Sequence, residues 1–203
     1  SALVLGSALL VVGCGSPSVS DVEYVERAKA HQEKRDWAAA TVELKNALQK
    51  NEDNVEARLL LGQVYLETGE GAAAEKELLR ARELGVSAES TAVSLGRALL
   101  LQGQFRRVLD ELVPLPDMSS RERAELLQVR GDAEFGLGDA DVACELYRES
   151  TELDSGYIAA YWGLAKCAYR EGHADIARSM IDTALKIDGS NAGSFTTGLR
   201  LGA

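Results

Sequence analysis

Glycines recur along this chain at a fixed interval, and that interval restricts the fold more than any other feature of the sequence. Three pairs lie 34 residues apart: Gly62 and Gly96, Gly69 and Gly103, and Gly138 and Gly172. Gly96 and Gly131 lie 35 apart. A period of this length is typical of stacked helical hairpins, in which each unit buries its apolar face against its neighbours. The sequence therefore predicts an elongated array of repeats.

The stretch VEARLLLGQVYLETGEGAAAEKELLRARELGVS, which starts at Val55, shows the repeat most clearly. Its apolar residues follow the i, i+3, i+4, i+7 spacing of two amphipathic helices. Gly62 and Ala74 are small and allow the helices to approach closely, and Tyr65 fills the space beside them. Gly69 supplies the left-handed residue that ends the first helix. With Leu61, Leu78 and Ala81, the stretch resembles the tetratricopeptide repeat family.

The resemblance covers residues 21–191 and implies an all-α fold, a right-handed α-solenoid of about five helical hairpins. The composition agrees, because Ala, Leu and Glu abound and the chain has only three prolines. The expected units are residues 21–54, 55–88, 89–123, 124–157 and 158–191. Residues 192–203 look like the start of a further repeat.

The third unit departs from the pattern in the run LVPLPDMSS, residues 112–120. A proline inside a helix costs about 3 kcal/mol, so Pro114 predicts that the second helix of this unit stops near Val113. Ser119 and Glu122 have the spacing of a capping box and predict that the next helix begins at Ser119 or Ser120. The interruption is a bend in the solenoid or only a long loop, and the loop is the simpler interpretation.

The N-terminal run SALVLGSALLVVG is apolar or small throughout. It is too short to span a bilayer and is typical of a signal-peptide core. The segment Val11-Val12-Gly13-Cys14 resembles a bacterial lipobox, which makes residues 1–14 a lipoprotein signal with a truncated start and Cys14 the lipidation site. Residues 15–20 then form a linker, and acyl chains supply the anchor. By resemblance to Gram-negative sorting rules, Gly15 favours the periplasmic face of the outer membrane; a plain secretory signal is the alternative.

The sequence contains no recognisable catalytic or metal site, so we expect no enzyme activity, metal or cofactor. His31 and His173 fall in different units, His31 at a packed or rim position and His173 in a solvated turn. Cys144 and Cys167 fall on neighbouring predicted helices. A disulfide between them is conceivable, but two separate buried thiols are the favoured interpretation, because disulfide geometry is unforgiving.

A partner-binding groove is expected where the first helix of each hairpin lines the concave side of the array. The net charge of −10 argues against nucleic acid as a partner. The groove positions combine apolar, aromatic and basic side chains, which predicts a protein or peptide segment with apolar and acidic side chains as the occupant. These positions are Lys29, Leu59, Gln63, Leu66, Arg97, Leu100, Phe135, Trp162, Lys166, Tyr169 and Arg170. The alternative is that these residues only flank the core or pack on further repeats.

A narrower resemblance rests on residues 44–85 and on LGRALLLQGQFRRVLDEL, residues 95–112. Both runs are similar to the PEP-CTERM system tetratricopeptide lipoprotein. That resemblance implies a non-catalytic periplasmic scaffold for exopolysaccharide export or PEP-CTERM protein sorting. An assembly factor for outer-membrane proteins or a type IV pilus secretin is the second hypothesis. An enzyme whose catalytic domain lies beyond Ala203 is the third.

Overall fold

A computed structural model describes residues 19–190, and within them the chain forms helices and no strand. The helices are α1 (Asp21–Glu33), α2 (Trp37–Lys50), α3 (Val55–Glu67), α4 (Gly71–Glu83), α5 (Ala88–Leu101), α6 (Phe105–Glu111), α7 (Ser120–Leu137), α8 (Ala140–Leu153), α9 (Ile158–Arg170) and α10 (Ala174–Ser190). None of these helices is both long and apolar enough to cross a membrane. The predicted signal segment, Cys14, most of the linker and residues 192–203 lie outside the described residues.

Polar side chains at the helix starts explain why the chain breaks into short helices. The side-chain oxygens of Asp36 and Asn54 accept hydrogen bonds from the backbone N–H groups of Ala39 and Ala57, at 3.1 and 2.9 Å. Ser20 caps α1 in the same way. Such caps satisfy N–H groups that lack a partner in the first turn of a helix.

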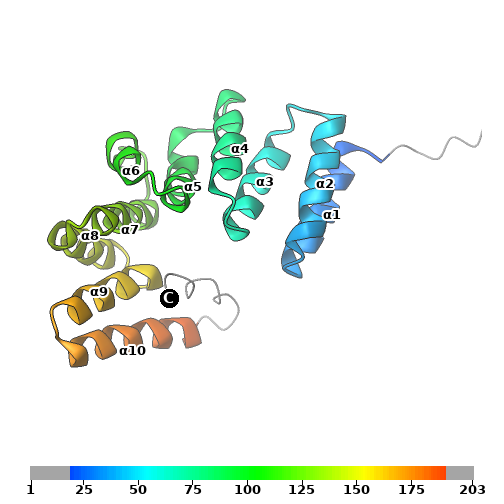
Figure 1. Cartoon of the computed structure of the whole chain (residues 1–203). Helices are drawn as coiled ribbons and strands as arrows, with labels where there is room; N and C mark the ends of the chain where they lie inside the picture. The colour runs from blue at the N-terminus through cyan, green and yellow to red at the C-terminus, as the bar shows by residue number, and fades with distance from the viewer. Residues whose placement is uncertain (1–18, 191–203) are drawn as a thin grey trace, which may run out of the picture.

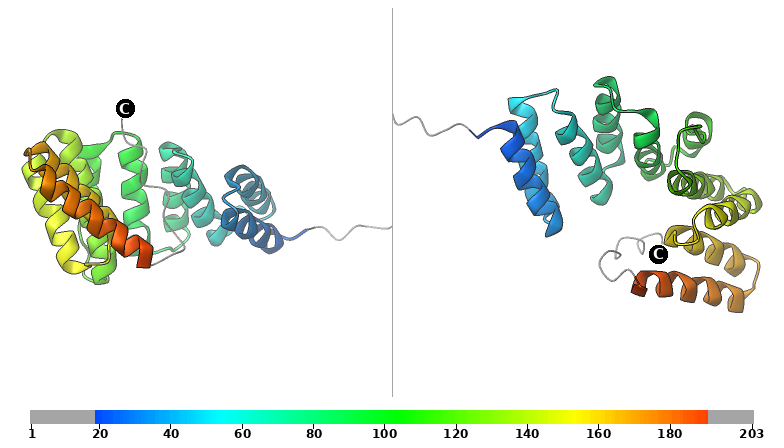
Figure 2. Two further views of the ribbon diagram at one scale, coloured as in Figure 1. Left: turned by 90° about the horizontal axis from the view of Figure 1, so that it is seen from below. Right: turned by 180° about the vertical axis from the view of Figure 1, so that it is seen from behind.

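Consecutive helices pair into hairpins, and the hairpins stack into an arc (Figure 1). The first helices lie on the inner side of the arc and the second helices on the outer side, most clearly from α5 to α10. Each of α2, α4 and α8 also packs on the first helix of the next hairpin. The view from behind shows the same open arc, and from below the stack is elongated (Figure 2). The predicted all-α solenoid of helical hairpins is confirmed.

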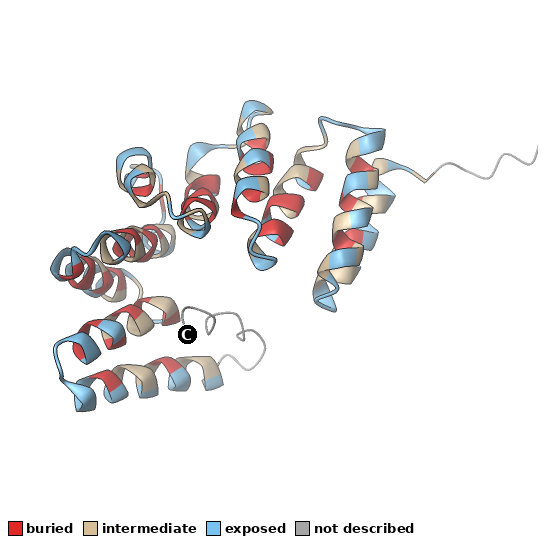
Figure 3. Cartoon of the chain, viewed as in Figure 1, coloured by how far each residue is buried: buried red, intermediate tan, exposed pale blue. Residues whose placement is uncertain are grey.

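The core runs between the helices along the whole arc (Figure 3). Large buried side chains recur at one position of the repeat: Leu44, Leu78 and Tyr147 in second helices, and Leu112 directly after α6. The predicted close approach at Gly62 is present, since a Cβ placed there would lie 2.9 Å from Cγ of Leu78. Tyr65 is buried beside it, as expected.

The third hairpin is shortened where the proline predicts it. Helix α6 ends at Glu111, and α7 begins at Ser120 with Ser119 as its cap. The capping box is complete, because the Ser119 side chain accepts from the backbone of Glu122 and the Glu122 carboxylate accepts from the backbone of Ser119. Helix α5 packs directly on α7 across the interruption, so residues 112–119 form a loop beside a continuous stack.

Arginines of α7 hold this loop in place. Arg130 donates to the backbone carbonyls of Leu109 and Leu112 at 2.9 and 2.7 Å. Arg123 donates to Pro116 O at 2.9 Å and to Met118 O at 3.2 Å. These donors replace the helical hydrogen bonds that carbonyls at the end of α6 and in the loop lack.

The favoured interpretation of the two cysteines was wrong. Cys144 of α8 and Cys167 of α9 form a disulfide, with their Cα atoms 5.9 Å apart. Both residues are buried, beside Tyr147 and Phe135. The bridge is possible because α8 packs directly on α9, and a sequence cannot show how closely two neighbouring helices approach. It links the fourth hairpin covalently to the fifth.

Candidate functional site

A residue in the left-handed conformation follows the first helix of every hairpin and fixes the register of the inner face. Four of these residues are glycines, and the first hairpin uses Arg35, whose φ is 55°. In each hairpin, the positions ten, six and three residues before this left-handed residue lie on one face of the first helix. The glycines are Gly69, Gly103, Gly138 and Gly172, with φ between 67° and 96°.

The positions ten residues back form a floor row that is largely covered. Val25 and Gln128 are buried, and the other members are half-buried. Leu59 and Val93 pack against a core cluster that extends from the second to the fourth hairpin. The floor row consists of Val25, Leu59, Val93, Gln128 and Trp162. It serves mainly to position the first helices.

The positions three residues back form an apolar row that stays accessible. Leu66, Leu100 and Phe135 are half-buried, each packed on one side against the core. Tyr169 is 77% exposed. The row starts in the second hairpin, since the first has Gln32 at this position. Four successive hairpins therefore offer an apolar side chain at the same place.

Most positions six residues back carry a charge, and we call them the charged row: Lys29, Arg97, Asp132 and Lys166, with Gln63 as the neutral member. Lys29 pairs with Glu26 at 2.6 Å and Glu56 at 2.7 Å. Lys166 lies 3.4 Å from Oδ1 of Asp132 and 5.9 Å from the ring centre of Phe135.

Ion pairs within the chain thus neutralise most of the predicted groove cations. Arg170, beside the apolar row, pairs with Asp141 at 2.7 Å. Arg97 is different: it is exposed, and no carboxylate among the described residues lies within ion-pair distance of it.

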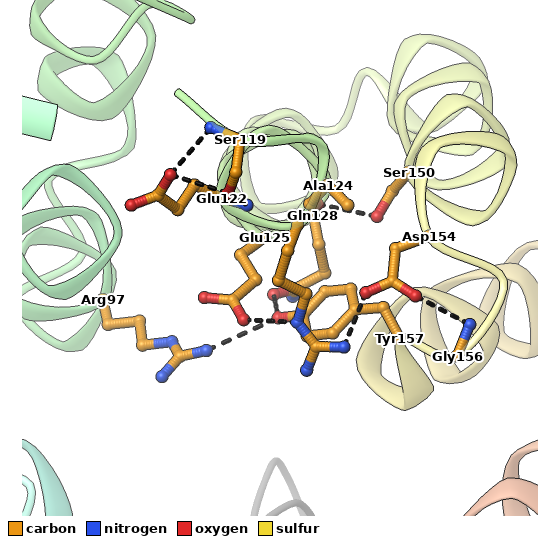
Figure 4. Close-up of polar contacts among 11 residues, drawn as sticks. Arg97, Ser119, Glu122, Ala124, Glu125, Gln128, Ser150, Asp154, Gly156 and Tyr157 are labelled. Carbon is orange, nitrogen blue, oxygen red and sulfur yellow. Dashed lines mark hydrogen bonds and ion pairs between the residues drawn. The ribbon is translucent and has the colours of Figure 1, made fainter. Parts of the chain in front are cut away.

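A chain of hydrogen bonds connects Arg97 with Asp132, two members of the charged row. Arg97 of α5 donates to the hydroxyl of Tyr157 at 3.4 Å, and Tyr157 donates to Oε1 of Gln128 at 3.0 Å (Figure 4). Gln128 donates in turn to Asp132, one turn further along α7. The Tyr147 hydroxyl donates to the other oxygen of Asp132 at 2.7 Å.

Burial sets the protonation of both tyrosines in this network. Burial raises the pKa of the Tyr147 phenol, and the Asp132 carboxylate raises it further. Burial also raises the pKa of Tyr157, although the Arg97 cation acts in the opposite direction. Both phenols therefore remain neutral at neutral pH and keep the protons that they donate in the network.

Sequence reasoning missed Tyr157 and Arg121 as parts of this face. Tyr157 precedes α9, and the Arg121 guanidinium lies 4.9 Å from the centre of its ring. Arg121 also pairs with Glu125 at 2.8 Å and with Asp154 at 2.6 Å. Tyr157 lies at the end of a repeat, where the register gives no groove position, so only the fold brings it to Arg97.

The described residues offer little for chemistry or small-molecule binding. No group of three or more His, Cys, Asp or Glu side chains among them could hold a metal ion. His31 lies 3.6 Å from Asp36, and His173, which is exposed, lies 3.3 Å from Glu171. A hollow of about 570 Å³ opens on α3 and α4, but it contains no member of the three rows.

Comparison with known families explains the repeat. Two tetratricopeptide repeat models match the chain, one over residues 31–89 and the other over residues 129–192, together more than half of its length. The chain belongs to the tetratricopeptide repeat family. No curated protein sequence matches it.

Solved structures of other tetratricopeptide repeat proteins have the same architecture as this chain. TTC0263 of Thermus thermophilus is 17% identical with a TM-score of 0.66, over 85% of this chain and 93% of that one. PilF of Pseudomonas aeruginosa is 18% identical with a TM-score of 0.62, over 87% of this chain and 78% of that one. YrrB, described as a tetratricopeptide protein with an unusual peptide-binding site, is 19% identical with a TM-score of 0.54, over 85% of this chain and 89% of that one. These likenesses concern the fold.

Proposed function

We propose that this protein is a non-catalytic scaffold that holds a segment of a partner protein along the inner face of its arc. The observation that carries the proposal is the apolar row, Leu66, Leu100, Phe135 and Tyr169. These side chains recur at one position of four successive hairpins, and one of them is exposed while three are half-buried. Aromatic and aliphatic side chains in register suit an extended or helical segment. The peptide-binding site named for YrrB gives a precedent on a similar fold.

Site-specific photocrosslinking in the native host tests this function. A photoreactive amino acid replaces Phe135 on the inner face or Val142 on the outer helix α8, where the side chain is 49% exposed. We expect crosslinks from position 135 to one defined segment of a partner and none to that segment from position 142. Equal crosslinking from both positions would remove the inner face as the binding site.

We further propose that the scaffold works in the periplasm, anchored to the outer membrane through a lipid on Cys14. The disulfide between Cys144 and Cys167 supports this location, because disulfides form and persist in oxidising compartments. A Cys14→Ser variant should move from the membrane to the soluble fraction, because it has no lipid attachment site. Unchanged membrane fractionation of this variant would exclude the anchor.

Within that compartment, we propose a role in exopolysaccharide export or PEP-CTERM protein sorting, which rests on the sequence resemblance. Identification of the crosslinked partner tests this role. A partner from the exosortase or polysaccharide machinery would support it. A partner from outer-membrane or pilus secretin assembly would replace it.

A further inference from the structure

The inner face carries cations although the protein is acidic. The structure shows which of these cations are already paired with a carboxylate of the chain and which could bind a carboxylate of a partner. Lys29, Lys166 and Arg170 each lie within 3.4 Å of a carboxylate of this chain. A partner carboxylate would have to compete with these internal pairs. Arg97 has no such competitor among the described residues, so it is the inner-face cation best able to receive a charge from outside.

The structure also holds Arg97 in position. One of its N–H groups reaches the hydroxyl of Tyr157 over a long 3.4 Å contact. Tyr157 is 3% exposed, and its hydroxyl is hydrogen-bonded to Gln128 (Figure 4). The hydroxyl that Arg97 contacts is therefore held in place. A guanidinium has five N–H donors arranged as a fork that fits a carboxylate. The other donors of Arg97 have no hydrogen-bond partner among residues 19–190, so they are available to bind a carboxylate.

Apolar side chains flank this cation along the same helix. Leu100 follows Arg97 by one turn of α5, and Val93 precedes it by one turn; both are half-buried. A ligand that reaches Arg97 therefore also meets Leu100. The next member of the apolar row is Phe135 on α7, the helix that packs directly on α5. This combination of one cation and an adjoining apolar row selects for one acidic side chain close to apolar ones.

We propose that Arg97 is the anchor for a single carboxylate, an Asp or Glu side chain of the bound segment, with an apolar residue of that segment on Leu100 and Phe135. The inference rests on the proposed function and specifies the partner's chemistry. Because Arg97 is positively charged, the expected occupant is an acidic protein segment. Nucleic acid does not fit, because the chain as a whole carries a net charge of −10.

Short synthetic peptides in matched pairs test the proposal. Each immobilised pair differs only in a central Glu or Gln, with Leu or Phe three or four positions away and neutral residues elsewhere. We expect the wild-type chain to bind the Glu member about three- to tenfold more strongly at low salt. Arg97→Gln should remove this preference. Arg106→Gln, which removes an exposed charge from the outer helix α6, should retain it.

The outcomes distinguish this inference from the function on which it rests. Peptides that bind in a manner sensitive to Phe135→Ser, but without preference for Glu, would overturn the carboxylate anchor and leave the scaffold function standing. Failure of every peptide to bind would count against both. A Glu preference that survives Arg97→Gln would overturn the assignment to Arg97, provided that circular dichroism shows the variant to be fully helical.

Discussion

The hydroxyl of Tyr147 donates a hydrogen bond of 2.7 Å to Oδ1 of Asp132. This contact joins the two helices of the fourth hairpin, and Lys166 of α9 lies 3.4 Å from the same oxygen. The Tyr147 ring is fully buried, whereas the charged row lies at the surface. A buried core position and an inner-face position are therefore connected by one hydrogen bond.

Removal of that hydroxyl should destabilise the protein. Tyr147→Phe removes the buried hydroxyl that donates to Oδ1 of Asp132 and leaves Gln128 as the buried donor to the other oxygen, so we expect the free energy of unfolding in urea to fall by about 1–3 kcal/mol. Tyr161→Phe is the matched control, because the Tyr161 hydroxyl donates to Ser155 O at an exposed site. Its effect should stay below about 0.5 kcal/mol. Equal effects of the two substitutions would show that the Asp132 contact contributes nothing specific.

Glycine at position 163 allows α9 to pack on the ring of Tyr147. A Cβ on Gly163 would lie 2.5 Å from Cγ and Cδ1 of that ring. Because the ring is buried and cannot move aside freely, Gly163→Ala should destabilise the chain by about 1–3 kcal/mol. Gly189→Ala meets no atom within 4 Å and should be neutral or slightly stabilising. Denaturant melts of the two variants check this, and a stable Gly163→Ala variant would contradict the packing.

The disulfide should contribute to stability by linking the last two hairpins. Cys144 and Cys167 are 23 residues apart, and closing a loop of that size is worth about 3 kcal/mol. A Cys144→Ser/Cys167→Ser variant should melt at a lower temperature than the oxidised wild type. A phosphine reductant should lower the melting temperature of the wild type and leave the variant unchanged. Identical melting of oxidised and reduced wild type would contradict a contribution from the bridge.

Glu75 should make part of the stability depend on pH. Burial raises the pKa of its carboxyl, but hydrogen bonds from Gln102 at 2.8 Å and Arg107 at 2.9 Å outweigh burial, and the net pKa lies below its ordinary value. A lowered pKa in the folded state stabilises the protein above the unfolded value. That stabilisation disappears as the pH falls through the folded pKa.

A comparison of Glu75→Gln with wild type measures this effect. The variant should be less stable by about 1 kcal/mol at pH 7, and the difference should shrink as the pH falls below about 4.5. Glu67→Gln changes an exposed carboxylate at the end of α3 and serves as the control. A difference between Glu75→Gln and wild type that does not vary with pH would contradict the role of the ionised carboxylate.

Local features of the sequence were sufficient to predict most of the fold. The Ser119–Glu122 capping box and the stop before Pro114 depend on neighbouring residues only, and the structure has both. The first hairpin has no glycine after its first helix, and Arg35 adopts there the left-handed conformation that glycine provides elsewhere. A sequence gives no sign of such a substitution.

Relations between distant residues could not be predicted in the same way. Arg97 and Tyr157 are 60 residues apart, and their contact depends on how α5, α7 and α9 stack. The pairing of Lys29 with Glu56 likewise crosses from one hairpin to the next. The repeat register selects the positions of the inner face, but the charge that each position presents depends on these partners.

Titration of the crosslinked partner segment against inner-face variants measures binding along the apolar row most directly. Fluorescence anisotropy of the labelled segment should show at least about a tenfold weaker affinity for Phe135→Ser/Tyr169→Ser than for wild type, with unchanged helical circular dichroism. The loss is expected because both side chains present apolar surface to the segment. An affinity equal to that of wild type would contradict the assignment of the inner face as the binding surface.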